Sequence, residues 1–460
     1  MQPCFYRLGR IATTLALAAT GCAELDEYKN GTICIYTTRP TDQAKREIAD
    51  FLAKNPDVGL WCDDLEDGDY IGDRYDGQSD ATAGKKLEWR VGSFSTGALI
   101  DRLESLAESE RPDVIWSVGL SHIRTAAGAS GASLPLHPYA PAATAKLIAE
   151  VSARSPGWQE LFDRVFLDAW TATDSERKRR HLAPRYTGMV AYVVAMCVHT
   201  ERLRALTICP EGQDTCDEPE KIRPYADWTP SQGLSWTDLT GPAFRGKIVM
   251  PRPDRTGSGL ITYNAMTHYM PGFRFDQLDT NMALYTRGGA DPCGVVASDP
   301  ALVVGISYDT AVCTQSSPEN GLDFVLPRDV DGRGQIPYDI EAVAIVEKPD
   351  IAPAAITFVD WAVSDDAMRK YAEFTTMTAL SVSRDDPPQC FRGADTDRHW
   401  IGAGQSQVLG VLASERKDVT REWCQKFCGC NCDTANATDL AKTACIPAKL
   451  RPDGVCPPAK

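Results

Sequence analysis

The residues Thr256-Gly257-Ser258-Gly259 are of the types that could bind an anion. They follow a proline-rich stretch at 251–255 and precede an apolar segment, which predicts a helix over 258–269. Backbone N–H groups at a helix start attract anions, and glycines let the anion come close. Ser and Thr are also good helix caps, so ordinary capping is the alternative interpretation.

Arg287 is a second candidate for anion binding. It precedes two glycines in the run YTRGGADPC at 285–293. A guanidinium can hold a phosphate or phosphonate through two parallel hydrogen bonds. The alternative is a surface arginine in a turn.

The chain carries no strong signal of an enzyme. TGSG lacks the lysine of a nucleotide-binding P-loop, and neither a GxSxG elbow nor an HExxH helix occurs. None of the six histidines has a catalytic spacing. A hydrolase with Ser258 as nucleophile would need a base within hydrogen-bond reach, and none is evident nearby. The sequence therefore predicts a binding protein and no cofactor.

The net charge of -15 argues against non-specific nucleic-acid binding, which needs a basic surface. It does not exclude a local anion site, because charges more than about 10 Å apart are largely screened at moderate salt.

The N-terminus predicts export. Arg7 and Arg10 precede a short apolar core at 11–19, followed by Ala19-Thr20-Gly21-Cys22. We expect a signal peptide at 1–21, a lipid-anchored Cys22 and a tether at 22–30. The protein would then lie in the periplasm or at the cell surface, held to the membrane. Plain cleavage with an ordinary Cys22 is the alternative.

Sixteen cysteines are present, and fourteen remain without Cys4 and Cys22. An even number in an exported chain suggests disulfides. The local candidate pairs are Cys209 with Cys216 and Cys293 with Cys313. The segment 424–460 predicts a small disulfide knot, with a metal site or a docking module as alternatives. The acidic insertion at 61–85 predicts a solvated loop rather than a calcium site.

Strands and helices alternate along the chain. Strands at 31–38, 87–94 and 113–118, separated by helices at 42–54 and 98–108, predict parallel pairing with right-handed crossovers. Further strands are expected at 187–199, 247–250, 302–307, 324–327 and 341–346, and a helix at 353–363. Ligands bind beyond the carboxyl ends of such strands, which places Thr37–Arg39 and Trp116–Gly119 at the binding edge.

Several longer motifs are similar to those of bacterial periplasmic solute-binding proteins. They are SWTDL (235–239), FRGKIVMPRPDRTGSG (244–259), YTRGGADPC with VVGISYDTA (285–311) and IPYDIEAVAIVEKPDIAPAAITFVDWAVSDDAMRKYA (336–372). The last two resemble the subgroup that binds 2-aminoethylphosphonate for an ABC importer. The resemblance covers roughly 31–427.

The resemblance implies a type II periplasmic-binding-protein-like fold of class α/β. Each of two lobes would be a mixed sheet flanked by helices, and the lobes would close on the ligand around a hinge. Lobe one would comprise 31–137 and 323–365, and lobe two 138–322 and 366–423. The implied partners are a small ligand and a membrane ABC permease, with no nucleic acid, and we expect a monomer.

The site hypothesis that follows has two ends. The phosphonate would lie at the start of the 258–269 helix, with Arg287 as its cation, and lobe one would close over it. The ammonium group would find acceptors and an aromatic face at the other end. The candidate residues are Thr37, Thr38, Trp116, Tyr186, Thr256, Gly257, Ser258, Gly259, Arg287, Tyr308, Asp309 and Glu341.

Two departures from the family pattern leave the solute open. TGSG replaces SGTG, and RGG replaces a Ser-Gly-Ser run, which removes hydroxyl donors. Ferric ion, a polyamine, phosphate or a sulfonate are alternative ligands. Ferric-ion binders use two adjacent tyrosines where this chain has Tyr308 and Asp309, which counts against iron, and no metal ligand is predicted.

Overall fold

The computed structural model describes residues 31–62, 65, 70–73, 89–94, 99, 102–103, 105–119, 123, 135–144, 185–209, 221–254, 256–270, 273–328, 335–373, 377–378, 390, 399–402 and 423. The predicted signal peptide (1–21), the tether (22–30) with Cys22 and the Cys-rich tail (424–460) lie outside these residues. The predicted helix at 98–108 lies partly outside them.

The N-terminal part of the chain forms a mainly parallel sheet. Strand β2 (Ile35–Thr37) pairs in parallel with β5 (Trp89–Ser93) and β6 (Val114–Gly119). Strand β4 (Tyr70–Asp73) adds an antiparallel edge to β5. We predicted that the acidic insertion at 61–85 is a solvated loop, and this is wrong for β4, whose Ile71 packs in the core. The prediction missed this strand because acidic residues dominate the composition of the insertion. β1 (Thr32–Ile33) and β3 (Gly59–Leu60) form a separate parallel pair.

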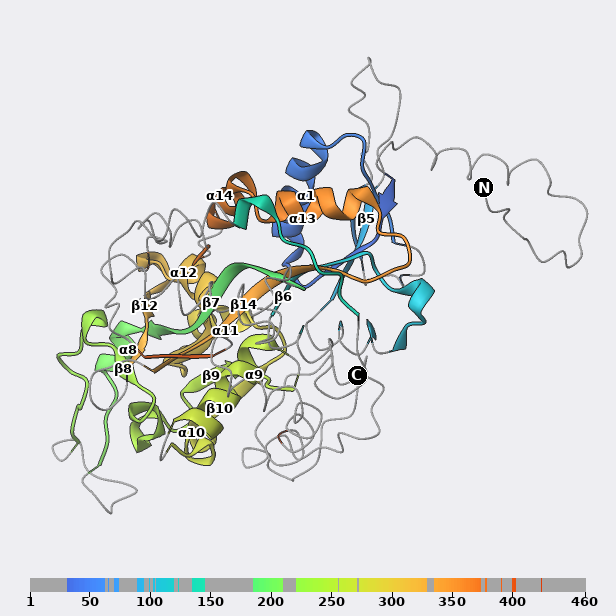
Figure 1. The fold of residues 1–460 in the computed structure, drawn as a ribbon. Helices are drawn as coiled ribbons and strands as arrows, with labels where there is room; N and C mark the ends of the chain where they lie inside the picture. Colours follow the sequence, from blue (N-terminus) through green and yellow to red (C-terminus); the bar gives the residue numbers. More distant parts are fainter. Residues whose placement is uncertain are drawn as a thin grey trace, which may run out of the picture.

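Helices α1 (Thr41–Lys54) and α13 (Pro353–Ala362) cover this sheet (Figure 1). Ala44, Ile48 and Phe51 repeat at helical spacing and are buried, which gives α1 its apolar stripe. The ring of Phe51 lies 5.0 Å from that of Phe358 on α13. Both helices were predicted.

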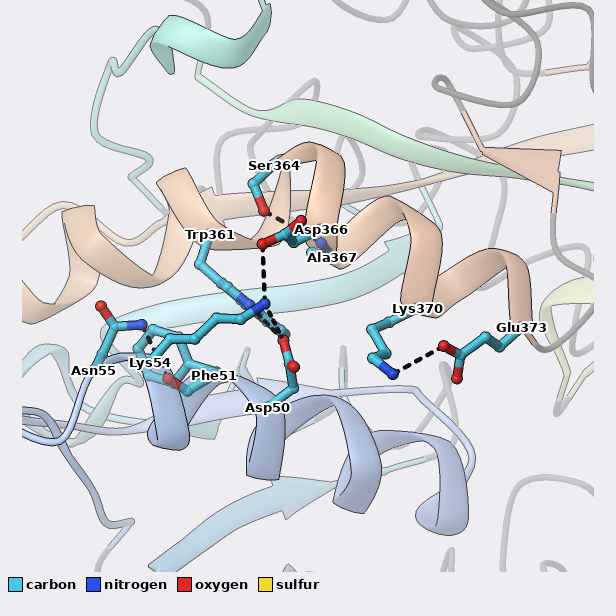
Figure 2. A network of polar contacts seen from close by, with 10 residues as sticks. All are labelled: Asp50, Phe51, Lys54, Asn55, Trp361, Ser364, Asp366, Ala367, Lys370 and Glu373. Atoms are coloured by element: carbon cyan, nitrogen blue, oxygen red, sulfur yellow. Dashed lines mark hydrogen bonds and ion pairs between the residues drawn. The ribbon is translucent and has the colours of Figure 1, made fainter.

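Polar contacts tie helix α14 (Asp365–Glu373) to α1 (Figure 2). The ammonium group of Lys54 lies 2.9 Å from Asp50 and 3.1 Å from Asp366 on α14. The indole N–H of Trp361 donates to the same Asp50 at 3.4 Å. The Lys54–Asp366 pair is exposed, so its contribution to stability is small.

Two long strands connect the two halves of the molecule. Strand β7 (Thr187–His199) and strand β14 (Gln335–Ile345) pair with each other antiparallel. The second half of β14 pairs with β6, and the second half of β7 pairs with β11. The strand order is β10-β9-β11-β7-β14-β6-β2-β5-β4, so one continuous mixed sheet runs through this pair (Figure 1).

The second half of the sheet contains β9 (Ile248–Pro251), β10 (Met282–Thr286) and β11 (Val304–Tyr308). β9 lies between the other two and is parallel to both. Its helices are α9 (Gly257–Asn264), α10 (Phe275–Asn281), α11 (Asp291–Ser298) and α12 (Asp309–Gln315). The predicted 258–269 helix begins one residue earlier and changes to a π-helix over Ala265–Tyr269.

The remaining elements are short. They are α8 (Thr200–Arg204), β8 (Leu234–Ser235), β12 (Leu322–Val325), β13 (Pro327–Arg328), β15 (Met377–Thr378), β16 (His399–Gly402) and 3-10 turns at Glu108–Glu110, Pro230–Gln232, Asp238–Thr240, Pro242–Phe244 and Pro318–Asn320. No helix in the described ranges is long and apolar enough to cross a membrane.

Disulfides join Cys34 to Cys62, Cys197 to Cys293 and Cys313 to Cys390. The predicted Cys293–Cys313 pair is therefore wrong. The sheet places β7 beside β11 and its helix α11, so the neighbour of Cys293 in space comes from a strand 96 residues away in sequence. Cys209 is disulfide-bonded, and Cys216, its predicted partner, lies outside the described residues.

The α/β class and the mixed sheet flanked by helices are confirmed. The lobe boundaries within the chain stay predictions.

Trp423 anchors the end of the core of the second half. It is fully buried, and its ring meets that of Tyr285 edge-on at 4.9 Å. We expect Trp423→Ala to lower the free energy of unfolding by about 3–5 kcal/mol, because it leaves a large cavity. Denaturant titration measures this. Ile222→Ala, at a 51% exposed position, should change it by less than about 0.5 kcal/mol. Equal denaturation midpoints for the two variants would contradict the placement of Trp423 in the core.

Candidate ligand-binding site

A cavity of about 210 Å³ lies where the two halves of the sheet meet. It is lined from one half by the loop after β2, the end of β6 and β14, and from the other by α9, the loop after β10 and the start of α12. The space is large enough for several water molecules. This suits a small solute. The lining residues are Thr38, Arg39, Pro40, Gln43, Gly119, Tyr192, Thr256, Gly257, Ser258, Arg287, Gly288, Gly289, Tyr308, Thr310 and Glu341.

Thr256 is the N-cap of α9. Its hydroxyl accepts a hydrogen bond from the N–H of Gly259 at 3.0 Å and donates to the carbonyl of Arg252 at 2.9 Å. Both the Thr256 hydroxyl and the Gly259 N–H, which we predicted as ligand donors, are thus already engaged. A Cβ on Gly259 would lie 2.6 Å from the Arg252 carbonyl oxygen, so this glycine serves close packing of α9 on β9.

Ser258 supplies the free hydroxyl at the start of α9. The residue is only 5% exposed, and its Oγ has no hydrogen-bond partner among the described residues. The N–H groups of Gly257 and Ser258 lie in the first turn, where no helix carbonyl can accept them. These donors line the cavity and would suit an anion.

Arg287 brings a positive charge to the same end. It is exposed, lines the cavity and makes no ion pair within the described part of the chain. The following loop is held because the N–H of Gly288 donates to Asp291 at 2.7 Å. A Cβ on Gly289 would lie 3.0 Å from Ser258 Oγ, so the absence of a side chain there keeps this hydroxyl accessible.

Arg39 is a cavity residue that our list of candidate residues omitted. Its Nε lies 3.1 Å from Glu47, an ion pair without a well-directed hydrogen bond, and its Nη1 lies 3.4 Å from Glu341. Burial alone would lower the pKa of Arg39, but Glu47 and Glu341 raise it, so the guanidinium stays charged. The sequence could have identified Arg39 as a candidate, because it follows the carboxyl end of the first strand, where ligands bind in such sheets.

Two tyrosines form another part of the wall. The rings of Tyr192 and Tyr308 meet edge-on with centroids 6.4 Å apart. The hydroxyl of Tyr192 donates to Asp339 at 3.2 Å. Burial raises the pKa of both phenols, so both are neutral hydrogen-bonding groups at physiological pH.

Seven of the twelve predicted residues line the cavity: Thr38, Thr256, Gly257, Ser258, Arg287, Tyr308 and Glu341. Five do not: Thr37, Trp116, Tyr186, Gly259 and Asp309.

Three of these five belong to the interior. The ring of Trp116 packs against Phe358 at 5.4 Å, within the core under α13. Tyr186 is buried in the same core. The hydroxyl of Thr37 is buried and accepts the N–H of Arg39 at 3.1 Å. Thr37 and Trp116 sit at the predicted edge, but the alternation of side chains along a strand turns them away from the ligand space. Tyr186 precedes β7, and its ring packs into the core instead.

Asp309 lies between Tyr308 and Thr310 in the chain, and both of these residues line the cavity. It is fully buried, and its Oδ1 accepts the N–H of Val193 at 3.0 Å. Its Oδ2 has no hydrogen-bond partner among the described residues. Burial raises the pKa of this carboxyl to about 8.

Comparison with known proteins gives structural but no sequence relatives. No family model matches the chain, and no curated protein matches it. Among solved structures, AfuA of Actinobacillus pleuropneumoniae, a periplasmic binding protein with fructose-6-phosphate bound, is 17% identical and covers 86% of this chain and 98% of its own, with a TM-score of 0.55. The periplasmic binding protein P5PA is 14% identical over 86% and 99%, with a TM-score of 0.54.

The ferric binding protein of Campylobacter jejuni is 14% identical over 85% of this chain and 99% of its own, with a TM-score of 0.52. At these identities the comparisons show the fold. The chain has the two-lobed fold of periplasmic binding proteins, as predicted, and the cavity lies between the lobes.

Gly259→Ala tests whether this glycine serves packing. The added Cβ would meet the Arg252 carbonyl, so we expect a loss of about 1–3 kcal/mol in the free energy of unfolding. Gly294→Ala is the control, because its Cβ would lie 3.4 Å from the nearest atom, inside helix α11. We expect alanine at this helical position to stabilise the folded protein by up to about 1 kcal/mol. Chemical denaturation compares them, and a harmless Gly259→Ala would refute the packing role.

The buried Asp309 predicts a pH dependence of stability. Its carboxyl holds a proton up to about pH 8 in the folded protein but loses it at an ordinary acidic pKa when unfolded. The folded state thus binds more protons between these values, and the free energy of unfolding falls as pH rises through them. Asp309→Asn should flatten this slope between pH 5 and 8 in urea titrations. An unchanged slope would contradict burial as the cause.

Proposed function

We propose that this chain is the extracytoplasmic solute-binding component of an ABC importer. The two-lobed fold and a small cavity between the lobes support this role. Closure of the lobes on a ligand would present one defined surface to a membrane permease. Ser258 Oγ contacts no base among the described residues, which favours binding over catalysis.

The ligand that we propose is a small phosphonate such as 2-aminoethylphosphonate. The observation that carries the proposal is the unpartnered Ser258 hydroxyl, buried in the first turn of α9 and facing a cavity that Arg287 also lines. Three phosphonate oxygens would accept from this hydroxyl, from the first-turn N–H groups and from the guanidinium. AfuA, which has the same fold, was solved with a phosphate ester bound.

Glu341 would accept the ammonium group at the other end of the cavity. Its Oε2 is engaged by Ser117 and Arg39, while Oε1 has no partner among the described residues. Tyr192 and Tyr308 line the same cavity. A zwitterion with opposite charges at its ends matches this arrangement.

Ferric ion is the second candidate. Tyr308 and Glu341 line one cavity, and phenolate and carboxylate oxygens are hard ligands. The fold is also that of the Campylobacter ferric binding protein. No group of three or more His, Cys, Asp or Glu suited to a metal occurs in the described ranges. Ferric-ion binders use two adjacent tyrosines where this chain has Tyr308 and Asp309, and we therefore rank iron below a phosphonate.

The remaining parts of the proposal concern the protein's place in the cell. We propose a periplasmic or surface location, with the lipid on Cys22 as the anchor, and a monomer that meets its permease when loaded. The export pattern of the N-terminus supports this location.

Single substitutions at the anion end test the proposed site. We expect Ser258→Ala and Arg287→Ala each to weaken 2-aminoethylphosphonate binding about 10- to 100-fold, because each removes a hydrogen bond to a charged group. Isothermal titration measures this. Arg274→Ala is the matched control, since this arginine is exposed and paired with Asp276 away from the cavity. Full binding by both cavity variants would refute the anion end.

A panel of ligands separates the candidates. A thermal shift with 2-aminoethylphosphonate alone supports both ends of the site, since a ligand at 100 times its Kd adds about 2.7 kcal/mol. A shift with phosphate as well retains only the anion end. A shift with Fe(III) or putrescine alone would overturn the phosphonate proposal.

A further inference from the structure

Ser117 has an unusual backbone conformation. Its φ is 59°, and among the described residues it is the only non-glycine residue with a positive φ. A side chain in this region costs about 1–3 kcal/mol, and such residues persist where the surroundings require them. Ser117 is fully buried at the end of β6, next to the cavity.

The strand pairing explains why the conformation arises. Ala342 of β14 pairs with Val118, and Val343 pairs with Trp116, so Ser117 is the extra residue of a β-bulge in β6. A second register shift occurs on the other side of β14, between Glu341 and Ala342. Bulges redirect side chains near binding sites, and both bulges here adjoin Glu341.

Both polar groups of Ser117 contact the cavity wall. Its carbonyl accepts a hydrogen bond from the hydroxyl of Thr38, and its own hydroxyl donates to Glu341 Oε2. Thr38 and Glu341 both line the cavity, whereas Ser117 does not. Ser117 therefore links one wall residue from the loop after β2, through its carbonyl, to another from β14, through its hydroxyl.

The contacts of Glu341 show why the hydrogen bond from Ser117 matters for the cavity. Arg39 and Ser117 share Oε2, and this leaves Oε1 as the acceptor that faces the ligand space. Glu47 is buried nearby and contacts the same guanidinium of Arg39, so Arg39 divides its charge between two carboxyl groups. Ser117 thus provides the hydrogen bond that, beside the longer Arg39 contact, fixes the rotamer of Glu341.

We infer that Ser117 is a positioning residue that sets the specificity of the cleft for solutes with a cationic amine. It accepts the strained backbone because a side-chain hydroxyl at this bulge holds the Glu341 carboxylate together with Arg39. The inference deepens the proposed function, since it concerns the amine end of the same site.

Two variants at this position separate strain from the hydroxyl. Ser117→Ala keeps the strained backbone and loses the donor, while Ser117→Gly loses both. We expect both variants to bind 2-aminoethylphosphonate about 10- to 100-fold more weakly by isothermal titration. Binding of ethylphosphonate, which lacks the amine, should change less than about threefold. Ser117→Gly should melt at a higher temperature than Ser117→Ala, because glycine accepts a positive φ.

Equal losses for both phosphonates, or no loss for either, would overturn the inference. A Ser117→Gly protein that melts no higher than Ser117→Ala would overturn the strain argument.

A ligand-free crystal structure of Ser117→Gly provides a test that does not depend on the proposed function. We expect Glu341 to leave its contact position or to occupy several rotamers. An unchanged Glu341 would overturn the inference even if wild-type protein binds the phosphonate. A displaced Glu341 in a protein that binds no phosphonate would support the positioning role and refute the proposed ligand.

Discussion

The antiparallel pairing of β7 with β14 is the interaction on which the site depends. It joins the two halves of one continuous sheet, and it places Tyr192 and Glu341 on adjacent strands. The cavity lies where residues of these two strands meet the start of α9 and the loop after β2. A slip of one residue in the register of this pair would turn Tyr192 or Glu341 to the other face of the sheet and so remove it from the cavity wall.

An acidic protein can still hold an anion in this cavity. The first turn of α9 offers unpaired N–H groups, and Arg287 adds a charge without an ion-pair partner among the described residues. On the opposite side, Arg39 is buried between Glu47 and Glu341, and these two carboxyl groups offset its positive charge. The cavity thus has donor groups at α9 and an acceptor, Glu341, on β14, although the net charge is -15.

Much of the fold could be predicted from the sequence, because apolar runs and helical spacing are local. The strands β6, β7 and β9 and the helices α1 and α13 lie where they were expected. The partner of Cys293 could not be predicted, since it depends on which strands lie side by side.

The site could be predicted only in part, because it too depends on which groups meet in space. Spacing identifies Ser258 and Arg287, but it cannot tell that the Thr256 hydroxyl is used as a cap or that Trp116 points into the core. The bulge at Ser117 has no sequence signal, because serine gives no sign of a positive φ. The most direct measurement is a crystal structure with 2-aminoethylphosphonate. We expect phosphonate oxygens within hydrogen-bond distance of Ser258 Oγ and the amine at Glu341, and a ligand bound outside this cavity would contradict the proposed site.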